Sequence, residues 1–135
     1  MSDFGKTIHR VNYMKSITIQ LPLPSSSLNA HGKTHWRKQQ GPRKKAREDA
    51  CILAKHAAKG IKFERATVSY SFKFPCNRGR DLANYIQMCK PYIDGIVDAG
   101  VIPDDKWQTL GIGAVVAEVD KNNPGVILHL MDRND

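Results

Sequence analysis

The sequence predicts a single-domain α+β fold in which helices pack on a mixed or mostly antiparallel sheet. With 135 residues, 41% of them hydrophobic, the chain is long enough for one core and too short for two ordinary domains. Segments that alternate apolar and polar residues are separated by segments with helical periodicity. Their order is β-α-β-α-β-β, which is typical of helices layered on a sheet. We expect the domain to cover residues 15–135. Residues 1–14 form an N-terminal extension whose order the sequence does not decide.

The first half of the chain contains one strand, one long loop and one helix. Residues 15–21 (KSITIQL) alternate as a strand does and end at Pro22. Residues 22–42 are rich in Pro, Ser, Asn and Gly and predict a loop. A helix is expected over 42–59, with Pro42 in its first turn and Gly60 at its end. Its expected apolar side consists of Ala46, Ala50, Leu53 and Ala57.

The second half alternates strand and helix again. Residues 66–75 (ATVSYSFKFP) predict a strand that leads into the basic loop CNRGR. Helical periodicity covers 82–99, and Gly100 is the expected cap. Pro91 predicts either a kink or a short leading turn followed by a second helix. Strands at 110–119 and 126–131 are expected to form a hairpin across the turn-rich DKNNPG. The expected apolar side of the helical segment consists of Ile86, Ile93, Ile96 and Val97.

The charge of the chain favours a polyanionic partner. The net charge is +8 and the isoelectric point is about 9.6, although charge alone does not separate nucleic acid from acidic membrane or solubility. No acidic residue lies between Asp3 and Glu48, and Trp36 accompanies the cations there. We expect contacts to DNA phosphates, which position DNA without reading its sequence; the alternative is a solvated helix face. The expected DNA-binding residues are Lys33, Arg37, Lys38, Arg43, Lys44, Lys45, Arg47, Arg78 and Arg80.

Several features exclude other classes of protein. No apolar stretch is long enough to span a membrane and the start lacks a secretory signal, so we expect a cytoplasmic protein without a membrane partner. Three widely spaced cysteines predict neither a disulfide framework nor a metal knuckle. His31 and His35 have no second ligand pair and are interpreted as loop residues near DNA. Trp107 is a core residue, a dimer contact or a base-stacking wedge, and the sequence does not separate these.

Carboxylates and a lysine at the strand–helix junctions predict a site for phosphodiester chemistry. Asp81 follows one strand, and Asp104 and Asp105 precede the next. If those strands are neighbours, the carboxylates can approach one another and hold Mg²⁺, with Lys90 offsetting negative charge on the phosphate. The simpler alternatives are a helix N-cap at Asp81, a solvated turn at Asp104–Asp105, and a surface pair between Lys90 and Asp94.

Residues 80–105, RDLANYIQMCKPYIDGIVDAGVIPDD, resemble the central signature of the RusA Holliday junction resolvases, which are bacterial and bacteriophage endonucleases. The resemblance covers about Ile17 to Met131 and includes the strand and proline-rich loop near the N-terminus. It implies a RusA-like nuclease domain that acts as a homodimer on branched DNA, in recombination and repair, inside a bacterial host cell. It also implies Mg²⁺, with Mn²⁺ as a substitute, and paired symmetric nicks in four-way junctions. The implied site residues are the metal ligands Asp81, Asp105 and Asp104, the catalytic Lys90, and the supporting Asn84 and Asp94.

The sequence departs from the family pattern at Ala83, where the family has its second aspartate. This departure has two explanations, an introduced Asp→Ala change or a natural variant, between which the sequence does not decide. We therefore expect a junction-selective, metal-dependent endonuclease whose own cleavage is impaired. The alternatives are a non-catalytic DNA- or RNA-binding module of the same fold, and a basic scaffold protein that acts through protein contacts.

Overall fold

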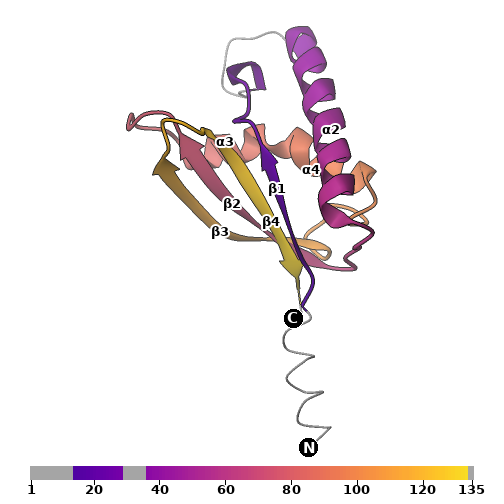
Figure 1. Ribbon diagram of the computed structural model, residues 1–135. Helices are drawn as coiled ribbons and strands as arrows, with labels where there is room; N and C mark the ends of the chain where they lie inside the picture. The colour runs from indigo at the N-terminus through magenta and orange to yellow at the C-terminus, as the bar shows by residue number, and fades with distance from the viewer. Residues whose placement is uncertain (1–13, 29–35, 134–135) are drawn as a thin grey trace, which may run out of the picture.

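The computed structural model describes residues 14–28 and 36–133, with only the backbone described at residues 27 and 36–39. Its strands and helices follow the expected β-α-β-α-β-β order, so the α+β class is confirmed (Figure 1). The elements are β1 (Ser16–Leu21), the 3-10 helix η1 (Ser26–Leu28), α2 (Trp36–Ala58), β2 (Ala66–Phe74), α3 (Leu82–Met88), α4 (Lys90–Asp98), β3 (Leu110–Val119) and β4 (Gly125–Asp132).

The four strands form one mixed sheet in the order β1-β4-β2-β3. β4 pairs antiparallel with both β1 and β2, whereas β3 pairs parallel with β2. The predicted hairpin between the last two strands is therefore wrong, because β2 lies between them. Alternation shows which face of a strand is buried but not which strand is its neighbour, and the turn-rich loop crosses the end of β2 instead, where the Asp120 amide donates to the Phe74 carbonyl at 2.8 Å.

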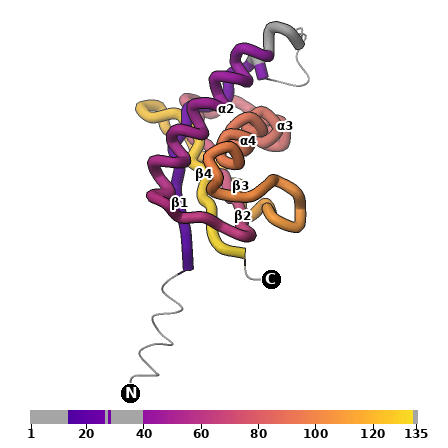
Figure 2. The backbone as a smooth tube through the Cα atoms, turned by 90° about the vertical axis from the view of Figure 1, so that its right-hand side faces the viewer, coloured from indigo at the N-terminus to yellow at the C-terminus, as the bar shows by residue number. Residues whose placement is uncertain are grey.

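The helices cover one face of the sheet, and the core lies between the two layers. In Figure 1, α3 and α4 cross behind the strands, and in the view turned by 90° in Figure 2 they lie on one side of the strands while α2 runs across β1. Alternate residues of β1 and β2 are buried accordingly. The largest fully buried side chains belong to Phe72, Ile19, Ile96, Ile102, Leu128 and Leu130.

Helix α2 differs from its prediction in its start and in its buried face. It begins at Trp36, so that Pro42 lies inside the helix rather than in its first turn. Ala50, Ala54 and Ala58 are almost fully buried, while Leu53 is 38% exposed. Small residues are needed on the buried side because α4 approaches closely at Gly95. A Cβ atom on Gly95 would lie closest to the Arg47 carbonyl oxygen and 2.8 Å from the Ala50 Cβ.

The break predicted at Pro91 is confirmed, and it divides the helical segment into α3 and α4 at Cys89. Gly100, with φ of +77°, ends α4 as expected. Its amide donates to the Val97 carbonyl at 2.9 Å, and the Val101 amide donates to the Ile96 carbonyl at 3.4 Å. This pair of bonds is a Schellman motif, in which the left-handed residue is almost always glycine. The helical segment that connects β2 to the parallel strand β3 is therefore interrupted at Cys89 and ends at Gly100.

Candidate functional site

Asp81 stands at the start of α3 and caps it. Its Oδ1 accepts hydrogen bonds from the amides of Ala83 at 3.0 Å and Asn84 at 3.4 Å. Its backbone is extended, with φ of −90° and ψ of 106°, as expected for an N-cap. The N-cap interpretation of Asp81 is therefore confirmed. The cap leaves Oδ2 outside these bonds, so capping and ligand binding are compatible roles for one carboxylate.

Lys90 is the centre of a charged cluster at the α3–α4 break. It is the first residue of α4, and its Nζ donates to Asp94 Oδ1 at 2.7 Å and to Asp105 Oδ2. Asp94 lies one helical turn away, as the spacing predicts, whereas Asp105 arrives from the segment that precedes β3. The parallel pairing of β2 and β3 makes this contact possible, because the chain must return along α3 and α4 to begin β3.

The protonation states of this cluster are mutually stabilised. Partial burial opposes the charge of Lys90, but the hydrogen bonds to Asp105 and Asp94 outweigh it and raise the pKa of Lys90. The hydrogen bond from Lys90 lowers the pKa of Asp105. Lys90 is therefore an ammonium group at neutral pH. It can stabilise negative charge and donate hydrogen bonds, but it cannot act as a general base.

Asp104 has a different environment from its neighbour. Its Oδ1 accepts a hydrogen bond from the Lys106 amide at 2.9 Å, which is a turn-forming contact. Asp105 instead directs its carboxylate to Lys90. Of the predicted far carboxylates, Asp105 is thus the one that joins the lysine, while Asp104 shapes the turn that delivers it.

The carboxylates are suitable in kind for Mg²⁺ but few in number. Within residues 14–28 and 36–133, no three His, Cys, Asp or Glu side chains gather closely enough to hold a metal ion. Ala83 lies exposed in the first turn of α3, so its methyl group leaves this part of the site without a carboxylate. Magnesium commonly takes one or two carboxylates together with waters and substrate phosphates. Asp81 lies at the start of α3, whereas Asp105 bonds Lys90 beyond the other end of that helix, and no hydrogen bond or ion pair of the described structure joins Asp81 to Lys90 or Asp105. The predicted ligands are therefore not brought together, and a metal ion there would take most of its oxygens from water and phosphate.

Asn84 stands out as a buried acceptor. Its side-chain Oδ1 is buried, and no hydrogen-bond donor for it is found in the described part of the chain. Asn84 lines a cavity of about 250 Å³ together with Ser26, Arg78 and Arg80. Buried polar atoms are usually paired, so this oxygen is available to a water or to a ligand that enters the cavity.

The predicted DNA-binding residues on α2 divide into exposed and paired groups. Arg43, Lys44 and Lys45 are exposed, although Lys45 Nζ lies 2.9 Å from Asp49 Oδ2. Arg47 binds Asp98 of α4 in a bidentate pair, in which Nε donates to Oδ2 at 2.5 Å and Nη2 donates to Oδ1 at 2.8 Å. This pairing fastens α2 to α4 and engages Arg47 within the protein. Lys33, His31 and His35 lie outside the described residues, as do the side chains of Trp36, Arg37 and Lys38.

The two arginines of the loop after β2 also have separate roles. Arg80 Nη1 donates to the carbonyl oxygens of Cys76 at 2.8 Å and Arg78 at 3.3 Å. Its guanidinium carbon lies 4.4 Å from the centre of the Phe74 ring, a cation–π contact. Arg80 therefore stabilises the loop, whereas the exposed Arg78 is positioned to meet an anion. Arg80 Nη2 also donates to Cys76 Sγ at 3.5 Å, and this hydrogen bond, followed by one from the Arg78 backbone, lowers the pKa of the Cys76 thiol.

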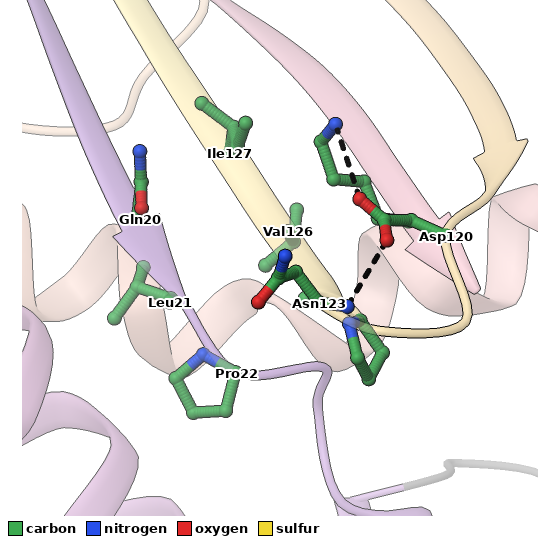
Figure 3. Close-up of a pocket in the computed structure, with 10 residues that line it drawn as sticks. Gln20, Leu21, Pro22, Asp120, Asn123, Val126 and Ile127 are labelled. Atoms are coloured by element: carbon green, nitrogen blue, oxygen red, sulfur yellow. Dashed lines mark hydrogen bonds and ion pairs between the residues drawn. The ribbon is translucent and has the colours of Figure 1, made fainter. Parts of the chain in front are cut away.

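A larger cavity, of about 520 Å³, lies between the end of β1 and the start of β4, next to the end of β2. Figure 3 shows it, with Gln20 and Pro22 on one side and Asp120 and Asn123 on the other. The Asp120 carboxylate accepts from the Asn123 amide at 3.0 Å and lies 3.9 Å from Lys73 Nζ. The Asp120 carboxylate is thus already bonded within the protein. None of the predicted site residues lines this cavity.

Some of these features escaped the sequence analysis. The Arg47–Asp98 pair joins residues 51 positions apart, and no local pattern announces it. Trp107 is 75% exposed, which excludes the core among its three interpretations.

Comparison with known proteins gives little further guidance. No model of a known protein family matches this chain. An uncharacterised protein of Xylella fastidiosa is 34% identical over 101 residues, which is 72% of this chain. The match spans 65% of that relative's length, so the chain corresponds to only part of it. Among the described residues, no helix is long and apolar enough to cross a membrane.

Proposed function

We propose that this chain is a structure-selective, divalent-metal-dependent endodeoxyribonuclease of the RusA type, whose own cleavage is impaired by Ala83. Its substrate would be the four-way DNA junction, cut by a homodimer through paired symmetric nicks. One observation carries the proposal. The Lys90 ammonium group meets Asp105, which lies 15 residues further along the chain, at the break between α3 and α4. Both residues belong to the segment 80–105 that resembles the signature of the resolvases, in which Lys90 is the implied catalytic lysine and Asp105 an implied metal ligand.

The chemistry of the cluster suits phosphodiester cleavage. Lys90 remains protonated and half-exposed, with its side chain 51% accessible, so a phosphate oxygen can reach it. A fixed cation at that position would stabilise the negative charge that develops as the phosphodiester is attacked. Lys90 Nζ also donates to Asp94 Oδ1 at 2.7 Å, so the ammonium group would keep one carboxylate partner if Asp105 bound another cation.

A metal ion would complete this arrangement. Asp81 and Asp105, with Asp104 beside them, are the residues that would hold Mg²⁺ or Mn²⁺, which when bound would polarise the phosphate and activate water. Asp105 would exchange part of its bond with Lys90 for the metal. The exposed cations on α2 and Arg78 would hold the DNA backbone in register.

The second candidate function is a non-catalytic DNA- or RNA-binding module. Two observations favour it: Asp81 is already engaged as a cap, and no three metal-binding groups gather in the described residues. On this hypothesis the exposed cations bind phosphates and the carboxylates are structural. Binding would then be strongly salt-dependent and indifferent to EDTA.

Cleavage of a labelled four-way junction distinguishes the two functions. The proteins compared are the chain itself, Ala83→Asp, and Ala83→Asp combined with Asp81→Asn, each with Mg²⁺ and with Mn²⁺. Ala83 is exposed in the first turn of α3, where a carboxylate is favoured by the helix dipole, so the restored variant should fold. We expect symmetric nicking by Ala83→Asp alone. If all three proteins bind the junction and none cuts it with either metal, the binding-module hypothesis replaces the nuclease.

A further inference from the structure

A second cavity, of about 450 Å³, opens directly beside the Lys90–Asp105 pair. It lies where β3, at the edge of the sheet, extends beyond the helices. Val68 of β2 is fully buried, but its neighbour across the ladder, Ile112 of β3, is 63% exposed. The apolar face of the sheet therefore continues one strand further than its helical cover. Apolar side chains that line the cavity include Tyr70, Ile86, Ile93 and Leu110.

The rim of this cavity is polar and charged. Lys90 and Arg43 contribute positive charge, Gln87 contributes an amide, and Asp105 contributes a carboxylate. Apolar walls bury the faces of a flat ring, and an amide can pair with the donors and acceptors along its edge. Two cations at the mouth would bind the phosphate attached to that ring. The combination matches the parts of a nucleotide.

We propose that this cavity receives a single unstacked nucleobase from the branch point of the DNA, with Ile112 and Ile86 against the base and Gln87 at its edge. This inference rests on the proposed function, and it adds a base-binding site beside the predicted cleavage site. Lys90 would then lie between the bound base and the adjacent phosphate. Lys90 and Asp105 are on the rim of the cavity, so binding of the base inside it would place the phosphodiester attached to that nucleotide at the Lys90–Asp105 pair.

Charge favours a nucleotide over a second copy of this chain as the occupant. A second copy docked here through the same residues would bring its own Arg43 and Lys90 against these two cations. Covering these charges with protein would also remove their water without supplying an anion. A nucleotide brings its own phosphate, and so it satisfies the cations while its base covers the exposed Ile112.

The test compares three four-way junctions that differ at one nucleotide of the branch point, bound in EDTA so that no cleavage occurs. One junction is fully paired, one carries an unpaired thymidine, and one carries an abasic nucleotide at the same position. The unpaired base is already free to leave the stack, and the abasic site keeps the flexibility and phosphate while removing the base. We expect the protein to bind the thymidine junction roughly tenfold more tightly than the abasic one, the range for one stacked base.

Two variants locate the effect. Ile112→Ser removes one wall of the cavity, and Val116→Ser is the matched control because it is 54% exposed on the same strand, on the opposite face of the sheet. The tenfold ratio should fall to about twofold or less in Ile112→Ser, because the base loses apolar contact, and should be unchanged in Val116→Ser. Thermal unfolding of both variants confirms that each is folded.

The possible outcomes separate this inference from the function on which it rests. Equal affinity for the thymidine and abasic junctions overturns the base-binding site and leaves junction recognition standing. A ratio that survives Ile112→Ser overturns the location. If that variant also changes from dimer to monomer in sedimentation, the surface belongs to a second copy. Failure to bind any of the junctions overturns the proposed function, and the base-binding site with it.

Discussion

Replacing Gly95 by alanine should force α2 and α4 apart. A Cβ atom at this position would lie 2.8 Å from the Ala50 Cβ and 2.9 Å from the Cys51 backbone nitrogen, and closer still to the Arg47 carbonyl oxygen. All three atoms belong to α2, and two of them are backbone atoms that no side-chain rotation can move. The helix as a whole must therefore shift, and the Arg47–Asp98 bonds between α2 and α4 would be strained with it.

The expected loss follows from two opposing effects. Overfilling a packed contact costs about 1–3 kcal/mol, and the upper part of that range applies because the obstacle is backbone. Alanine recovers up to about 1 kcal/mol because it has the higher helix propensity. We expect a net loss of about 2 kcal/mol in the free energy of unfolding. For a domain of this size, that corresponds to a melting temperature lower by roughly 8 °C.

Gly41→Ala is the matched control for this experiment. Gly41 lies within α2, and apart from its own chain neighbours and the adjoining helix backbone no atom would come within 4 Å of an added Cβ. Because Pro42 follows, the new Cβ would crowd the proline ring and offset the gain in helix propensity, so this substitution should change the free energy of unfolding by less than about 1 kcal/mol in either direction. Urea denaturation at neutral pH measures both variants. The reasoning is refuted if Gly95→Ala is as stable as the original chain, or if Gly41→Ala loses as much stability as Gly95→Ala.

Three further expectations concern single groups. Asp81→Ala should lower the free energy of unfolding by about 1 kcal/mol in urea denaturation, and Asp81→Ser should restore most of it, because serine also caps helices. Hydrogen bonding to Arg47 lowers the pKa of Asp98. The pair should therefore stabilise the fold fully above pH of about 4 and lose its effect as the pH falls through the lowered pKa. The stability lost in Asp98→Asn should be largest at pH of about 6 and should shrink steadily as the pH falls below about 4. Burial raises the pKa of Cys89 to about 12, so mass spectrometry should find it unalkylated by iodoacetamide in the folded protein while the exposed Cys76 reacts.

The local parts of the fold were accessible from the sequence. Period-two alternation located each strand to within about two residues, and Pro91 and Gly100 fixed the break and the end of the helical segment. The order of the strands was not accessible, because β4 pairs with partners distant in sequence and alternation carries no information about them. The sequence also did not predict that α2 begins at Trp36. Proline is common in the first turn of a helix, so Pro42 indicated a start near residue 42, whereas it lies inside α2.

The site was accessible to the same degree. The spacing of Lys90 and Asp94 predicts a helical pair, and their bond is present. The contact of Lys90 with Asp105 required the parallel placement of β2 and β3, which the sequence analysis could state only as a condition. The sequence also did not show that Arg47, one of the predicted DNA-binding cations, is paired with Asp98. Local charge patterns count cations, but only the packed structure shows which are already neutralised.

The central position of β4 affects how the chain is made. β4 is the last strand of the described residues, yet it lies between β1 and β2, and β1 pairs with no other strand of the described structure. During synthesis β1 therefore emerges from the ribosome well before β4 and stays unpaired until β4 has been translated. If β4 did not form, β1 would have no partner strand and would be separated from the β2–β3 pair. The closing step of folding also depends on contacts between distant parts of the chain, which generally slows it. A host cell would have to protect the exposed apolar edges of the nascent chain until then.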